Sequence, residues 1–259
     1  MDDEIGLLEG LATTRAIRRL TPDPVSTDDL ATVLFAATRA PSGSNRQPFR
    51  FLVLRDGPRA VRAKALLGEA FRRMWAAKRA DDGYASGSGA DDASPKARMA
   101  RTMQRFVDGF EQTPVVVLAC LVRYREGGAH EGASVYPACQ NLLLAARAIG
   151  LGGVMTLWHA PVEAELRTLL DIPDDVFVAA TITLGHPEGG HGPVRRRPVR
   201  ELVYDDAWGA GAPWAVEPEG TRHSGTGPAG PGGHEQGPAG PGGHEQGPAG
   251  PGGHEQSPP

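Results

Sequence analysis

Two kinds of hydrophobic pattern alternate along the first 190 residues of the chain. In long segments, apolar residues recur three and four positions apart, which is the period of an α-helix. Between these segments lie short, unbroken apolar runs, which are typical of strands buried on both faces. The predicted helices are 2–14, 27–39, 59–79, 95–111, 133–149 and 161–170, and the predicted strands are 49–55, 114–122, 154–157 and 176–184. Helices and strands therefore mix throughout, which predicts an α/β or α+β domain.

Local signals support several of these boundaries. Ser26 precedes Thr27, Asp28 and Asp29, a cap and acidic first turn that stabilise the start of a helix. Gly150 follows the predicted helix 133–149 and is its expected stop. Residues 81–94 are rich in Gly, Ser and Asp, which predicts a loop between two helices.

The charge of the chain is concentrated at its C-terminal end. The net charge at pH 7 is −4, and residues 213–259, with one Arg and five Glu, account for all of it. The preceding residues carry 26 basic and 26 acidic side chains, and such a balanced body is a poor non-specific binder of nucleic acid. The sequence GPAGPGGHEQ occurs three times over residues 227–256, with no apolar residue larger than Ala. We therefore expect a domain over 1–212 and a disordered tail over 213–259.

Several other classes of protein are disfavoured by the sequence. The longest apolar run, residues 114–122, is far shorter than the roughly 18–20 residues of a membrane span. The first four residues are acidic rather than basic, and the two Cys cannot form a disulfide framework, so we expect a cytoplasmic protein. Hydrolase and metal-site signatures are missing from the sequence. The segment 150–153 has the glycines of a dinucleotide fingerprint but follows a helix, the reverse of the required order.

Three polar segments remain as candidates for chemistry. Arg side chains cluster in 14–20 and again in 194–198, and Arg forms fork-like contacts with phosphate oxygens. The loop 40–49 offers backbone N–H groups together with Asn and Gln side chains, which suit a flat heterocycle. Each segment also has a structural explanation: solvated basic patches for the Arg clusters, and an ordinary turn for the loop.

Taken in chain order, these segments resemble motifs of the nitroreductase-like, FMN-dependent flavoprotein family. Residues 14–18 resemble its Arg-Arg-Ser-x-Arg motif, and 41–49 resemble its Pro-Ser-x-x-Asn-x-Gln-Pro-Trp loop. Residues 140–152 resemble its helix followed by Gly-Leu-Gly. Its closing motifs resemble Leu-Gly-His-Pro at 184–187 and Arg-Arg-Pro at 196–198. The likeness spans residues 5–208, with the motifs in the family's order.

The resemblance implies an α+β fold, a central mixed sheet flanked by helices, in an intertwined homodimer with exchanged terminal segments. Two FMN molecules would lie at the dimer interface. The implied cofactor-binding residues are Arg15, Ala16, Arg18, Ser42, Gly43, Asn45, Gln47, Met155, Thr156, Leu157 and Arg196. The three Arg would hold the phosphate, Ala16 would contribute backbone alone, residues 42–47 would come from the partner subunit, and residues 155–157 would run along the ring.

The sequence departs from the family pattern at three of these motif positions. Thr14 replaces the first Arg and Ala16 replaces the Ser, so two phosphate or ribityl contacts are missing or changed. Arg19, Arg195 and Arg197 are nearby cations that could compensate. Phe49 stands where the family often has Trp.

The implied activity is hydride transfer through the flavin. NADH or NADPH would reduce FMN at N5, and an electron-poor acceptor, a nitroarene or quinone, would then bind in the same place in a ping-pong cycle. The flavin itself does the chemistry, so no side chain is assigned a catalytic role. The expected acceptor contacts are Ser44, Trp75 and Tyr84, the last two within a lid over 70–110. The alternative for the lid aromatics is a helix core face, with Phe106 and Phe110 at i and i+4.

Two other functions stay open at the level of sequence. One is a flavin-dependent dehydrogenase or reductase that tailors a specialised metabolite, because one fold hosts several redox reactions. The other is a non-catalytic flavin-binding or storage protein, which the changes at Thr14 and Ala16 suggest. In every case the expected partners are a second copy of the chain and a small molecule, with neither nucleic acid nor membrane.

Overall fold

The computed structural model describes residues 5–84, 86–124, 126–128, 130–190, 194 and 196–218. Arg195 and the three C-terminal repeats lie outside this part of the chain. The helices are α1 (Leu7–Thr13), α2 (Thr27–Ala37), α3 (Pro58–Asp81), α4 (Pro95–Asp108), α5 (Tyr136–Ala148) and α6 (Glu163–Leu170). The strands are β1 (Phe49–Leu54), β2 (Val115–Val122), β3 (Gly152–Thr156) and β4 (Val176–Gly185). Every helix and strand predicted above has its counterpart here.

The four strands form one sheet in the order β1-β2-β4-β3. All three strand pairs are antiparallel, so the described sheet is not mixed as the resemblance implied. β2 and β4 lie in the centre, whereas β1 and β3 form opposite edges. Because of this order, the loop that precedes β1 and the segments on either side of β3 lie at opposite edges of the sheet.

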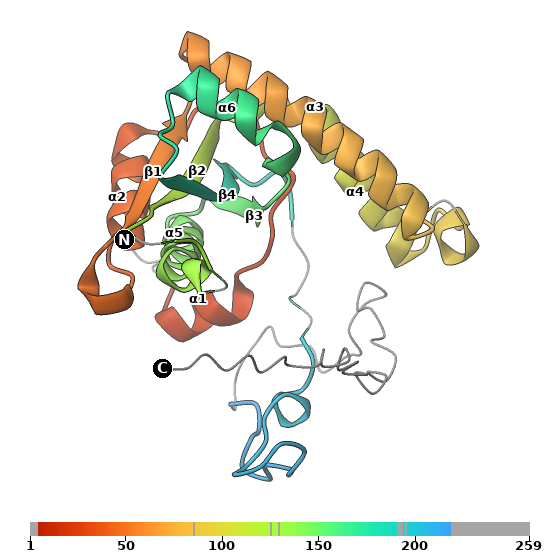
Figure 1. Ribbon diagram of the computed structural model, residues 1–259. Helices are drawn as coiled ribbons and strands as arrows, with labels where there is room; N and C mark the ends of the chain where they lie inside the picture. Colours follow the sequence, from red (N-terminus) through yellow and green to blue (C-terminus); the bar gives the residue numbers. More distant parts are fainter. Residues whose placement is uncertain are drawn as a thin grey trace, which may run out of the picture.

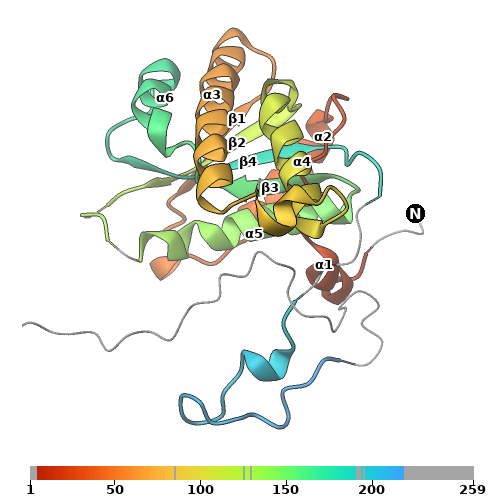
Figure 2. The same cartoon turned by 90° about the vertical axis from the view of Figure 1, so that its right-hand side faces the viewer.

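Helices cover both faces of the sheet and make three layers (Figures 1 and 2). Successive residues of a strand point to opposite faces. In β2, Val117 therefore packs with α2 and α5 in one core, while Leu118 packs with α3, α4 and α6 in the other. All of β2 but its last residue is buried, as its unbroken apolar run predicts.

The helices α3 and α4 form a hairpin that extends beyond the sheet (Figure 1). Its inner face is aromatic: the Phe71 ring lies 4.4 Å from Phe110 and 6.2 Å from Phe106 between ring centroids. All three rings are buried. Phe106 and Phe110 are therefore core residues, as the alternative predicted, although Phe110 lies in the 3-10 turn Phe110–Gln112 that follows α4 and not on the same helix.

Residues 196–218 lead away from the three layers in both views (Figures 1 and 2). Hydrogen bonds within this segment stabilise it. The Val199 N–H donates to Glu217 Oε1 at 2.9 Å, and Trp214 Nε1 donates to Asp205 Oδ2 at 2.8 Å. These contacts continue past residue 212, the expected end of the domain. Trp208 is 93% exposed, which makes it the most exposed large apolar side chain of the described residues. Within the same residues, no helix is long and apolar enough to cross a membrane.

Candidate functional site

The first Arg cluster runs along the edge of the sheet beside β3. The Ile17 N–H donates to the Gly153 carbonyl at 2.8 Å, and Leu20 forms an isolated bridge with Pro187. A Cβ on Gly152 would lie 2.9 Å from Ile17 Cγ2, so the side chain of Ile17 occupies the space that glycine leaves. The segment that carries Arg15 and Arg18 is thereby fixed against the sheet.

Arg18 is a half-buried cation in this segment. Burial, and then the positive charge of Arg15, lower the pKa of its guanidinium below the usual value. Within the described part of the chain, the Arg18 guanidinium has no hydrogen-bond or ion-pair partner. A pocket of about 240 Å³ opens beside it, where the charge of Arg105 is already compensated by Glu188 at 2.7 Å. The arrangement favours an anion next to Arg18.

The end of β3 offers an apolar surface on the same edge of the sheet. Met155 is 40% exposed and Leu157 is 54% exposed, while Thr156 between them is half-buried. Ala16, next to Arg15, is exposed as well. The structure therefore brings the Arg segment and β3, which are far apart in sequence, side by side at Ile17 and Gly153.

The loop 42–47 has an unusual backbone conformation and lies at a different edge of the sheet from the Arg segment. Ser44, Asn45 and Gln47 have positive φ values of 52°, 51° and 49°, a left-handed backbone that non-glycine residues rarely adopt. Ser42 Oγ accepts from the Gln47 N–H at 2.9 Å and fixes this shape. Such strain persists where the surroundings enforce it and is common at binding sites.

This loop joins α2 to β1, at the edge of the sheet opposite β3 (Figure 1). Three strand spacings, about 14 Å, separate the two edges. One chain therefore does not bring residues 42–47 to the Arg segment. If both groups line one ligand, the loop comes from a second copy.

The remaining predicted residues lie in three other settings. Arg196 is exposed at the start of the C-terminal segment. Tyr84 is half-buried at the end of the α3–α4 hairpin, 5.2 Å from Trp75 between ring centroids. Trp75 is only 2% exposed, and its Nε1 donates to Gln104 Oε1 at 3.0 Å. Trp75 thus packs inside the hairpin, which leaves its side chain out of reach of a substrate in this arrangement.

The described residues contain no cluster of three or more His, Cys, Asp or Glu side chains that could hold a metal ion. Both thiols are buried, and burial raises the pKa of Cys120 to about 11 and that of Cys139 to about 12. Both thiols are therefore protonated at neutral pH, a poor state for a nucleophile.

Comparison with known proteins adds a family to this geometry. The family model described as Nitroreductase family matches residues 11–186. This chain belongs to the nitroreductase family. It is 31% identical over 195 residues to an NADH dehydrogenase of Thermus thermophilus, which covers 73% of this chain and 90% of that protein. It is 29% identical over 194 residues to a nitrobenzene nitroreductase of Ectopseudomonas oleovorans, which covers 66% of this chain and 82% of the relative.

Solved structures agree with this membership in the nitroreductase family. A nitroreductase from Desulfovibrio desulfuricans, solved in complex with FMN, superposes with a TM-score of 0.55 at 27% identity. The likeness covers 77% of this chain and 96% of that structure.

Two glycines at the start of β3, Gly152 and Gly153, have a packing role in this nitroreductase-family chain that the sequence did not reveal. Gly152 allows Ile17 to approach, and Gly153 allows β4 to approach, because a Cβ there would lie 2.0 Å from the Thr183 carbonyl oxygen. Gly152 ends the Gly-Leu-Gly motif at 150–152, and Gly153 directly follows it. The sequence could not assign a role to either glycine, because no local pattern says which segment lies against them.

Proposed function

We propose that this chain is an FMN-dependent oxidoreductase that transfers hydride from NADH or NADPH to an electron-poor small molecule, a nitroarene or quinone. The observation that carries the proposal is Arg18, half-buried and without a partner among the described residues, near the charge of Arg15 and in a segment that is hydrogen-bonded to β3 at Gly153. Family membership and the FMN-bound relative support it further.

The residues of the site fit the chemistry of FMN. Arg15 and Arg18 would hold the phosphate, because guanidinium groups form charge-assisted hydrogen bonds with phosphate oxygens. Thr14 Oγ1 is buried and has no hydrogen-bond partner within the described residues, so it is a further donor beside them. Met155 and Leu157 would lie along the ring, and Arg196 would join the phosphate from the C-terminal segment.

The chain's own residues bind and orient, and the redox chemistry belongs to the cofactor. When bound, FMN would accept hydride from NAD(P)H and pass it to the acceptor in a ping-pong cycle. The loop 42–47 would present backbone N–H groups and the Asn45 and Gln47 side chains to the polar edge of the ring. Its fixed left-handed backbone keeps these donors oriented before the cofactor binds.

We further propose that the working unit is a homodimer with exchanged terminal segments. An apolar groove of about 460 Å³ lies between α1, α2 and α5, rimmed by the exposed side chains of Leu7 and Phe35. In the C-terminal segment, Trp208 and Trp214 are 93% and 65% exposed. Exposed apolar surface of this kind favours association, and a second copy would also bring loop 42–47 to the Arg segment.

Reconstitution with FMN tests the proposal. The protein should be yellow, and NADH or NADPH should bleach the flavin absorbance anaerobically until a nitroarene or quinone restores it. Arg18→Ala should raise the dissociation constant for FMN about 10- to 100-fold, the value of a hydrogen bond to a charged group. Arg62→Ala, an exposed Arg of α3, is the matched control and should leave it unchanged. A protein that neither retains nor binds FMN contradicts the proposal.

A further inference from the structure

The pocket beside Arg18 lies between two parts of the chain that are far apart in sequence. One wall belongs to α4 and the residues that follow it, and includes Arg105 and Phe106. The other wall belongs to the Arg segment and includes residues 18–20. Glu188, three residues after the end of β4, lines the pocket as well. The contacts across this pocket therefore decide how the α3–α4 hairpin and the Arg segment are held relative to each other.

The Arg segment is hydrogen-bonded to the chain that leaves β4. The Glu188 N–H donates to the Arg19 carbonyl at 2.9 Å, and the Thr21 N–H donates to the His186 carbonyl, also at 2.9 Å. With the bridge between Leu20 and Pro187 described above, these bonds form a short antiparallel ladder. The backbone of Glu188 is thus bonded directly to the residue next to Arg18.

The side chain of Glu188 joins this ladder to the hairpin. Arg105 Nη2 donates to Glu188 Oε1 at 2.9 Å and to Glu188 Oε2 at 2.7 Å. Arg105 lies on α4, and the next residue, Phe106, is buried in the core that α4 shares with α3. The position of Arg105 is therefore set by the packing of the hairpin, and the ion pair transmits it to Glu188.

Arg18 lies between two anchored neighbours. On its N-terminal side, the Ile17 N–H is bonded to the Gly153 carbonyl of β3. On its C-terminal side, the Arg19 carbonyl is bonded to Glu188, which in turn holds Arg105. A side chain that binds a ligand gains affinity when its backbone is held in place beforehand, because less freedom is then lost on binding.

We propose that Arg105 and Glu188 are positioning residues for the phosphate of FMN. Their ion pair ties the ladder to the hairpin and keeps Arg18 in the orientation that the phosphate requires. Neither side chain would touch the cofactor itself. This inference rests on the proposed function, because it takes Arg18 as a ligand of the phosphate.

Binding of FMN and riboflavin to the flavin-free, full-length protein tests the proposal. The two ligands share the ring, but riboflavin lacks the phosphate. Arg105→Ala and Glu188→Gln should each raise the Kd for FMN about two- to fivefold, the range for a partly exposed ion pair, and leave the Kd for riboflavin unchanged. Quenching of flavin fluorescence measures both constants.

Two further variants sharpen the test. Arg105→Ala combined with Glu188→Gln should bind FMN no more weakly than either single variant, because the second change removes nothing once the pair is broken. Arg73→Ala is the matched control: it breaks an exposed ion pair on α3, Arg73 to Glu69 at 2.7 Å, and should leave both Kd values unchanged.

Three results would overturn the positioning role: an unchanged Kd for FMN in Arg105→Ala, equal weakening of FMN and riboflavin, or additive effects in the double variant. Equal weakening would mean a general loosening of the fold rather than a loss of phosphate contacts. A wild-type protein that binds no FMN would contradict the proposed function, and the positioning role with it. A wild-type protein that binds FMN and is reduced by NAD(P)H, together with an unaffected Arg105→Ala variant, would overturn the positioning role alone.

Discussion

Replacing Gly153 by Ala should separate β3 from β4 and disturb the Arg segment at the same time. The added Cβ would lie 2.0 Å from the Thr183 carbonyl oxygen and 3.1 Å from Leu184 Cδ2. The nearest atom is backbone, so no side-chain rotation relieves the clash, and the strand itself has to shift. Overpacking of this kind costs about 1–3 kcal/mol. The hydrogen bond from the Ile17 N–H to the Gly153 carbonyl would be strained as well, which adds about 1 kcal/mol.

The expected loss is therefore about 2–4 kcal/mol, a large part of the roughly 5–15 kcal/mol that holds a domain together. Urea unfolding followed by circular dichroism measures it, at one fixed protein concentration because association also contributes to stability. Gly190→Ala is the matched control, since its Cβ would meet no atom within 4 Å. Both changes remove the same chain entropy from the unfolded state. The difference between the stabilities of the two variants therefore measures the cost of the clash alone.

Gly153→Ala should also affect cofactor binding. A shift of β3 would move Ile17 and with it the Arg residues on either side, so FMN should bind more weakly to Gly153→Ala than to Gly190→Ala. A Gly153→Ala protein that unfolds at the same urea concentration as Gly190→Ala would refute the close approach of β3 and β4 at this position.

Three further outcomes are expected. Burial lowers the pKa of His159, so the folded state binds fewer protons than the unfolded state. The free energy of unfolding, measured by urea melts, should therefore fall as the pH drops below about 6.5. The fall should be smaller in His159→Gln. Trp75→Phe should lose the hydrogen bond to Gln104 and about 1 kcal/mol of stability in the same assay, with the KM for acceptors unchanged. Removal of residues 221–259 should leave the dimer in size-exclusion chromatography and the flavin content intact; loss of either would contradict our interpretation of the tail.

The hydrophobic pattern predicted the elements well because each has a strong local cause. β2 is an unbroken apolar run that lies in the middle of the sheet, and α5 ends where Gly150 takes a φ of +81°. The sequence also pointed to the loop 42–47, although two of its three left-handed residues, Ser44 and Gln47, are of types that rarely adopt this backbone.

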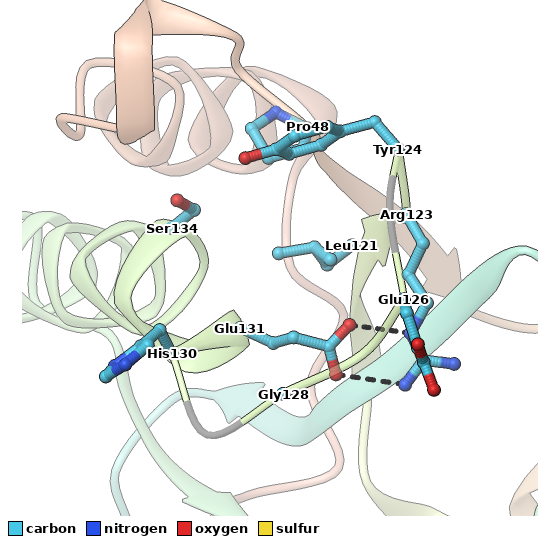
Figure 3. Close-up of a pocket in the computed structure, with 9 residues that line it drawn as sticks. All are labelled: Pro48, Leu121, Arg123, Tyr124, Glu126, Gly128, His130, Glu131 and Ser134. Atoms are coloured by element: carbon cyan, nitrogen blue, oxygen red, sulfur yellow. Dashed lines mark hydrogen bonds and ion pairs between the residues drawn. The ribbon is translucent and has the colours of Figure 1, made fainter. Parts of the chain in front are cut away.

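What the sequence could not give are the contacts between distant segments. The aromatic residues of 70–110 were expected to serve a lid, but Phe71 and Trp75 are buried in the α3–α4 hairpin. Their helical spacing suits either outcome, and the packing of α4 on α3 decides between them. A pocket of about 260 Å³ that Pro48, Leu121 and Ser134 help to line (Figure 3) could not be predicted for a related reason, because these three residues meet only through the fold.

The opposite placement of loop 42–47 and the Arg segment has a genetic consequence. If each flavin is held by the Arg segment of one subunit and the loop of the other, two defective chains can restore each other. In a mixed dimer of Arg18→Ala and Asn45→Ala chains, one site would carry both lesions and the other would be wholly wild type. Co-expression of two inactive alleles should therefore recover activity, and every such heterodimer should hold one intact site.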